Sequence, residues 1–255
     1  MRCTIFALTG MLLFNIEVAF CDTHTASVDE YINVFQTGAD ATKIQASKEL
    51  GWEGVTDTRL YDLIENQLNE LVMVADANSA NRNMIELIAH LIHALAYSGN
   101  TKYRPTLEGI LDKVLNTKVR RHANEALDEI DKYAVWNPII QATGSSNPEK
   151  SVRVNRVVNM LRSDDFELKR LGAKRVYFVR KYDQYELDTL AEELLSNMSS
   201  DRRDRIYVDS MKWMIKALAS SGNNAYADTL NRVEEEAVNS GIGRYSKSMA
   251  SKYLH

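Results

Sequence analysis

Four side chains that could bind a metal or move a proton recur at helical spacing between residues 86 and 97. Glu86, His90, His93 and Tyr97 follow one another at intervals of four, three and four residues, which places them along one stripe of an α-helix. Two imidazoles and a carboxylate on one face are ligand types that Zn²⁺ and Ni²⁺ accept. The alternative is a polar stripe that faces solvent or a neighbouring repeat.

The second interpretation of this stripe is favoured by the rest of the chain. The nearest further ligand, His122, belongs to a different helix, and the chain has no H-E-x-x-H, G-x-S-x-G or Gly-rich phosphate motif. We therefore predict no metal site, no cofactor and no catalytic residue. The positions 123 residues further along also lack the ligand set, because they hold Asp209, Trp213, Lys216 and Ser220.

A basic stripe on the predicted helix 165–182 is the stronger candidate for binding. It consists of Arg170, Lys174, Tyr177 and Lys181. Cations interleaved with an aromatic ring suit carboxylate-bearing or phosphate-bearing partners, whereas the alternative is a solvated face that nearby acids partly neutralise. Arg202 starts the next helix, and Trp213 lies on the polar side of that helix. We expect partner contacts from Arg170, Lys174, Tyr177, Lys181, Arg202 and Trp213.

The elements that position these side chains are helices. After Asp22, apolar residues recur at helical spacing and no segment alternates as a strand would. Only three prolines occur in 255 residues, and proline breaks helix interiors. We predict an all-α chain with helices near 27–36, 39–52, 57–75, 79–98, 102–116, 117–135, 150–162, 165–182, 184–198, 201–220, 224–239 and 243–254.

The chain repeats itself at a distance of 123 residues. Residues 92–100 read IHALAYSGN and residues 215–223 read IKALASSGN, each followed three residues on by a tyrosine, Tyr103 or Tyr226. A long-period match indicates stacked units of helix pairs. We predict an α-solenoid of two duplicated three-repeat halves, 22–140 and 150–255, joined by a linker or inter-repeat loop at 141–149.

Residues 119–127, VRRHANEAL, resemble the V-R-x-x-A-x-x-A-L helix of HEAT repeats, including the HEAT-like repeats named after phycobilin lyases. Weaker copies stand at 44–51 and 171–176. The resemblance implies a right-handed solenoid in which the second helix of each pair lines the concave side. It specifies packing rather than activity. Because some HEAT-type folds host enzymes, an accessory lyase-like or hydrolase-like subunit with a concave-face pocket is the alternative function.

Charge is distributed unevenly along the chain. Residues 22–141 contain 11 Lys and Arg against 18 Asp and Glu, a net charge of −7, whereas residues 149–255 contain 19 against 16, a net charge of +3. This asymmetry favours an anionic contact to the second half, or association between unlike halves of two copies. The acidic first half disfavours a nucleic-acid binder, so we expect no nucleic-acid partner.

Residues 1–21 have the pattern of a secretory signal peptide. Arg2 precedes an apolar run at 5–14, and Ala19 and Cys21 supply small residues before a cleavage point at Asp22. The run is too short to span a bilayer, so we expect membrane contact only before cleavage. The alternative, a lipoprotein anchored at Cys21, is disfavoured by the large Phe20 that precedes it.

These patterns together predict an exported, periplasmic module without catalytic activity. Its curved helical surface would bind a protein partner, whose identity the sequence does not name. Affinity would come from the concave helices and from the basic stripe of the second half. Analogy at the level of the fold carries most of this prediction, and fold alone does not define a function.

Overall fold

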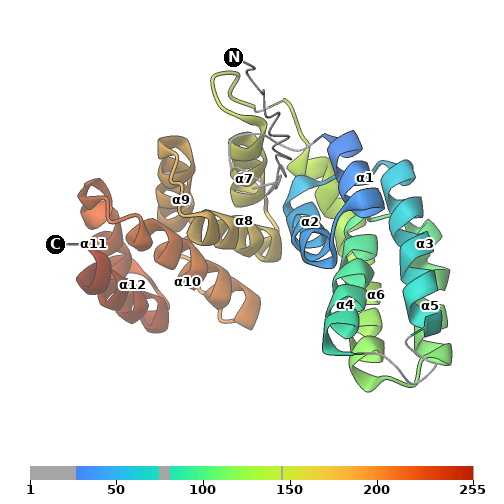
Figure 1. Ribbon diagram of the computed structural model, residues 1–255. Helices are drawn as coiled ribbons and strands as arrows, with labels where there is room; N and C mark the ends of the chain where they lie inside the picture. The colour runs from blue at the N-terminus through green and yellow to red at the C-terminus, as the bar shows by residue number, and fades with distance from the viewer. Residues whose placement is uncertain (1–26, 75–80, 145, 255) are drawn as a thin grey trace, which may run out of the picture.

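Every regular element in the described part of the chain is a helix, which confirms the all-α prediction (Figure 1). The computed structural model describes residues 27–74, 81–144 and 146–254. The predicted signal peptide at 1–21 lies outside these ranges. No helix within them is long and apolar enough to cross a bilayer.

The first part of the described chain runs from α1 to α6. Its elements are α1 (Val28–Thr37), α2 (Asp40–Glu53), α3 (Thr58–Val74), α4 (Arg82–Tyr97), the 3-10 helix η2 (Thr101–Tyr103), α5 (Arg104–Lys113) and α6 (Thr117–Ile140). The second part, from α7 to α12, likewise has a 3-10 helix before its fifth α-helix. Its elements are α7 (Val152–Arg162), α8 (Phe166–Val179), α9 (Gln184–Asn197), α10 (Arg205–Ser220), the 3-10 helix η3 (Asn224–Tyr226), α11 (Ala227–Glu236) and α12 (Ser240–Tyr253).

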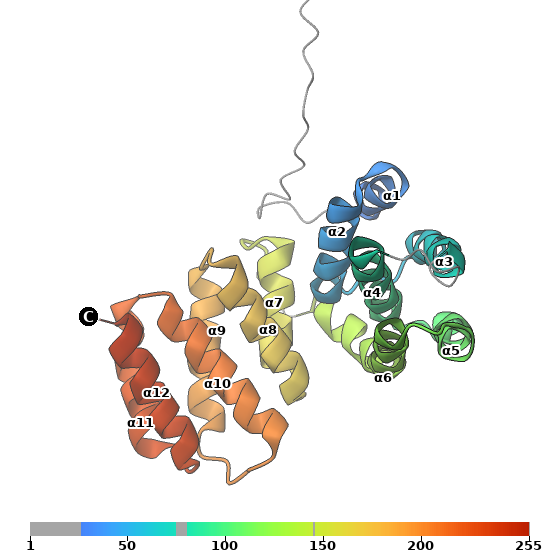
Figure 2. The ribbon, with the colours of Figure 1, turned by 60° about the horizontal axis from the view of Figure 1, so that its bottom comes forward.

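The helices pack in two rows. In the even-numbered row, α2 contacts α4, α4 contacts α6, α8 contacts α10 and α10 contacts α12. In the odd-numbered row, α1 contacts α3, α3 contacts α5, α7 contacts α9 and α9 contacts α11. Figure 2 shows α1, α3 and α5 as an outer row beside α2, α4 and α6. Side chains on even-numbered helices that are neighbours in this row can therefore meet.

Helix starts follow local capping by polar side chains. Ser27 and Glu30 form a complete capping box at α1. At α10, the Asp204 carboxylate accepts a hydrogen bond of 2.9 Å from the backbone N–H of Tyr207. The helix therefore begins at Arg205 rather than near residue 201, and Arg202 lies in the preceding loop.

Helix α6 is five residues longer than the sequence pattern predicts, and it contains Pro138. Proline removes one helical hydrogen bond and disfavours a helix interior. Continuation of the helix nevertheless buries Trp136 and Ile140, which are 5% and 0% exposed. The Asn137 side chain also donates hydrogen bonds of 3.0 and 3.1 Å to the backbone oxygens of Tyr97 and Ser98. Tertiary burial therefore outweighs the local preference of proline.

The two parts meet through charged and apolar contacts of α2 with α7 and α8. Arg175 on α8 forms a largely buried ion pair of 2.6 Å with Glu49 on α2, and its guanidinium lies 4.7 Å from the ring centroid of Trp52. Arg156 on α7 pairs with Glu53 on α2. Beside these pairs, a separate apolar cluster joins α6, α7 and α8. It consists of Tyr133, Trp136, Ile140, Met160 and Leu168.

Candidate binding surface and histidine cluster

Three of the predicted binding residues come together between α8 and α10. We call this region, formed by Lys174, Tyr177, Phe178, Trp213 and Lys216, the α8–α10 surface. The rings of Tyr177 and Trp213 lie 5.7 Å apart between centroids, and the Phe178 ring lies 5.2 Å from Tyr177 and 5.9 Å from Trp213. Phe178 is 61% exposed. The result is an aromatic patch with one ring open to solvent.

Two lysines lie against these rings. The Lys174 ammonium is 5.1 Å from the centroid of Trp213, and the Lys216 ammonium is 4.5 Å from Trp213 and 4.3 Å from Tyr177. All three distances suit cation–π attraction. Within the described residues, neither ammonium group forms an ion pair with a carboxylate. Their positive charge is therefore not neutralised by direct contact.

Local electrostatics reflect this accumulation of positive charge. Burial, and after it the charge of Arg170, lowers the pKa of Lys174 below its usual value. Burial alone would raise the pKa of Tyr177, but Lys216 and Arg180 beside the phenol lower the pKa overall. A nearby anion would relieve the repulsion among these cations.

The other predicted residues lie apart from this surface. Arg170 is one turn away from Lys174 and is ion-paired with Asp209 at 3.0 Å and with Glu167 at 3.2 Å. Lys181 lies beyond the end of α8, because the helix stops at Val179 and the next residue adopts a left-handed conformation with φ of 53°.

Arg202 lies at the opposite end of α8. Its guanidinium is 4.7 Å from the ring centroid of Phe166 and forms an ion pair of 2.8 Å with Asp204. The predicted stripe is therefore not a continuous row of free cations. Its middle turn alone joins the aromatic patch.

Phe178 and Lys216 belong to this surface but are not among the binding residues predicted from the sequence. Phe178 is adjacent to Tyr177, so a helical phase places it off the stripe, and its exposure depends on the end of α8 one residue later. Lys216 stands one helical turn after Trp213 on α10, and this i, i+3 spacing could have identified it.

The candidate metal stripe on α4 is divided by the fold. Glu86 is exposed, whereas Tyr97 is largely buried and its ring centroid lies 4.7 Å from that of Tyr133. Burial, and then the charge of Lys48, lowers the pKa of His90 to about 4. The remaining residue, His93, contacts side chains of α6, although its ring centroid also lies 6.3 Å from that of Tyr97.

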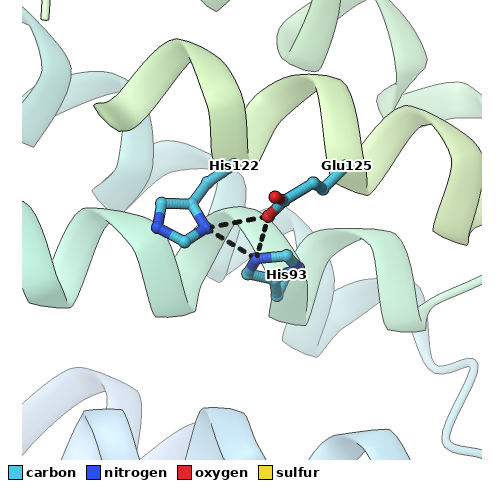
Figure 3. A group of neighbouring side chains, drawn as sticks. All are labelled: His93, His122 and Glu125. Carbon is cyan, nitrogen blue, oxygen red and sulfur yellow. Dashed lines mark hydrogen bonds and ion pairs between the residues drawn. The ribbon is translucent and has the colours of Figure 1, made fainter. Parts of the chain in front are cut away.

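His93 on α4 meets His122 and Glu125, which lie on α6 (Figure 3). His93 Nε2 lies 3.0 Å from His122 Nδ1 and 3.8 Å from Glu125 Oε2, and His122 Nδ1 lies 3.3 Å from the same carboxylate oxygen. Both imidazole side chains are mostly buried, at 16% and 17% exposed, and Glu125 is half exposed at 47%. The sequence pattern places the two histidines on separate helices and does not predict that they meet.

The other nitrogen of His93 also has a partner. Its Nδ1 lies 2.6 Å from Glu129 Oε2, one turn after Glu125 on α6. Burial, and then the charge of His93, lowers the pKa of His122 below its usual value. Sequence spacing offered one signal for this set: His122, Glu125 and Glu129 fall on one face of the helix.

The alternative function, an enzyme subunit, requires a pocket with a group that can transfer protons. One open hollow lies among Val28, Val55, Asp57, Gln141 and Arg156. Its carboxyl group, Asp57, has a pKa lowered chiefly by hydrogen bonds from Arg59, so it suits neither a general acid nor a proton shuttle near neutral pH.

Comparisons with known proteins give no family for this chain. No protein-family model matches it, and no curated protein matches it. Fold and local geometry therefore carry the function proposed for it.

Proposed function

We propose that the chain is an α-solenoid of HEAT-like repeats built from two homologous halves. Matching contacts support this duplication. Tyr103, in η2, donates its hydroxyl hydrogen to Asp62 of α3 at 2.7 Å, and Tyr226, in η3, donates its own to Asp188 of α9 at 2.7 Å. The SGN turns before these tyrosines recur at the same offset of 123 residues. Two rows of successively packed helices agree with a repeat array.

We propose further that this protein is an exported, non-catalytic interaction module that binds an acidic segment of a protein partner through the α8–α10 surface. The observation that carries this proposal is Phe178, whose ring is 61% exposed beside two other aromatic rings and two lysines. Aromatic anchors surrounded by polar groups are enriched at protein interfaces.

The chemistry of the surface defines the partner. Lys174 and Lys216 lie over aromatic rings instead of pairing with carboxylates. They can therefore form ion pairs with carboxylates of another chain. Phe178 offers an exposed apolar contact beside Trp213, the ring that both lysines approach. An acidic peptide segment with a nearby aromatic or aliphatic side chain satisfies both features. The predicted net charge of +3 for residues 149–255 would steer such a segment toward this half.

A defined peptide tests this proposal directly. Fluorescence anisotropy with a labelled peptide of glutamates and one central phenylalanine should show saturable binding that weakens as salt is raised. Phe178→Ala and the double variant Lys174→Glu, Lys216→Glu should each weaken this binding at least tenfold. Lys252→Glu is a matched control, because this lysine also lies over a ring, 5.1 Å from Tyr253, but on α12.

Either of two results would overturn the assignment. The first is binding of a lysine peptide with the same phenylalanine as tightly as the glutamate peptide. The second is an equal loss of affinity in Lys252→Glu and in the double variant.

A further inference from the structure

We propose that His93, His122 and Glu125 form a binding site for a divalent transition-metal ion of the Zn²⁺ class, between α4 and α6. One nitrogen from each imidazole and one carboxylate oxygen lie within 4.8 Å of one another (Figure 3). This site lies outside the α8–α10 surface, so it is independent of the proposed partner binding.

The spacing of the three atoms fits a tetrahedral ion. Zn–N and Zn–O bonds of about 2.0–2.1 Å require ligand atoms about 3.3 Å apart at the corners of a tetrahedron. The three observed separations are 3.0, 3.3 and 3.8 Å, which bracket that value. Displacements of the ligand atoms by a few tenths of an ångström would therefore suffice to accommodate the ion.

A second carboxylate supports the same assignment independently. Glu129 Oε2 lies 2.6 Å from Nδ1 of His93, the nitrogen that does not face the other ligands. Histidines that bind metals commonly donate this second N–H to a carboxylate, which fixes the tautomer and the ring orientation. Glu129 thus leaves His93 Nε2 with its lone pair directed at the cluster.

The backbone holds the ligands in place before an ion arrives. His122 and Glu125 are three residues apart on α6, so they share one helical face. Helices α4 and α6 pack together over fully buried Ile92, Val119 and Ala126. A site on two packed helices needs little rearrangement to bind, and rigid elements position ligands better than loops do.

Without an ion, the same groups form a chain of hydrogen bonds. The Glu129 carboxylate beside His93 Nδ1 assigns the His93 proton to that nitrogen, and with this tautomer His93 Nε2 accepts from His122 Nδ1–H at 3.0 Å. Arg121 Nη2 then lies 3.4 Å from His122 Nε2. Binding at His122 Nδ1 moves that ring's proton to Nε2, and the exposed Arg121 guanidinium swings away. Metal binding and this hydrogen-bonded form are therefore alternative states of one cluster.

The ion would keep an open coordination position. Three protein ligands leave a fourth corner for water or for a group from outside, as in zinc sites that are not purely structural. Glu125 is the most exposed of the three ligands, at 47%, so the cluster is accessible to solvent at this carboxylate.

Calorimetric titration of Zn²⁺ into the chain without a histidine tag tests the site, and visible absorption with Co²⁺ reports its geometry. Wild-type protein should show saturable Zn²⁺ binding that requires His93. Co²⁺ bound at the same site should give the absorption spectrum of a four-coordinate ion. Glu129→Gln should weaken Zn²⁺ affinity about 10- to 100-fold. His93→Ala, His122→Ala and Glu125→Gln should weaken it by more.

His90→Ala is the matched control, since His90 lies on α4 one turn before His93 but outside the ligand set. It should retain wild-type affinity. Helical circular dichroism of every variant establishes that the fold is intact. Wild-type affinity in a folded His122→Ala protein would overturn the site, as would loss of binding in His90→Ala. Absence of saturable Zn²⁺ binding by the wild type would also overturn it.

Discussion

Gly99 and Gly222 adopt the same left-handed conformation, with φ of 63° and 65°, at the ends of α4 and α10. Each follows a serine whose hydroxyl donates a 2.7 Å hydrogen bond to a leucine carbonyl, from Ser98 to Leu95 and from Ser221 to Leu218. Their surroundings differ. A Cβ on Gly99 would lie 2.5 Å from the backbone nitrogen of Ala134, whereas a Cβ on Gly222 would have no neighbour closer than 3.9 Å.

Alanine substitution at the two glycines should separate conformational strain from steric conflict. Gly222→Ala should lower the free energy of unfolding by about 1–2 kcal/mol, which is the penalty for a left-handed residue with a Cβ. Gly99→Ala should lower it by at least about 3 kcal/mol, because the α6 backbone at Ala134 must also shift. Chemical denaturation followed by circular dichroism measures both values. Equal losses at the two positions would show that the α6 backbone does not lie this close to Gly99.

Buried Glu186 should give stability a specific dependence on pH. Burial raises the pKa of this carboxyl to about 7, although Arg153 lies 3.0 Å away. The folded state therefore holds a proton that the unfolded state releases near its ordinary pKa of 4.5. Between these values the folded state binds more protons, so the free energy of unfolding declines as pH rises from about 4.5 through 7 and levels off above.

Glu186→Gln removes this contribution, and the comparison with wild type isolates it. The stability of wild type minus that of the variant should fall by up to about 3 kcal/mol between pH 5 and 8, which is the free energy of the pKa difference. Urea denaturation at several pH values measures the difference. Glu192→Gln, an exposed position on the same helix α9, is the control for loss of one carboxylate. A difference that stays constant or rises with pH contradicts the raised pKa.

Most helices were predictable because their apolar periodicity comes from the row packing itself. Helix ends were less predictable where distant residues decide them. The pattern near Pro138 predicts an end at residue 135, yet burial of Trp136 and Ile140 extends α6. At α10, both Asp201 and Asp204 could cap the helix, and only the fold selects Asp204.

The candidate binding residues show the same division between local and tertiary information. Helical spacing predicts that Lys174 and Tyr177 share a face, and the structure adds Trp213 from the next even-numbered helix. Helical spacing does not predict that Asp209 neutralises Arg170, because that ion pair joins two helices. The meeting of His93 with His122 likewise depends on the packing of α4 against α6, which no spacing along the chain encodes.

The most direct measurement of the central claim is capture of a partner by the immobilised chain with variants of the α8–α10 surface. A crosslinked envelope extract should yield one protein that the wild type and Lys252→Glu retain at low salt and release at high salt. The triple variant Lys174→Glu, Phe178→Ala, Lys216→Glu should not retain it, while its helical circular dichroism stays unchanged. Equal retention of that protein by the folded triple variant would contradict the proposal that this surface binds the partner.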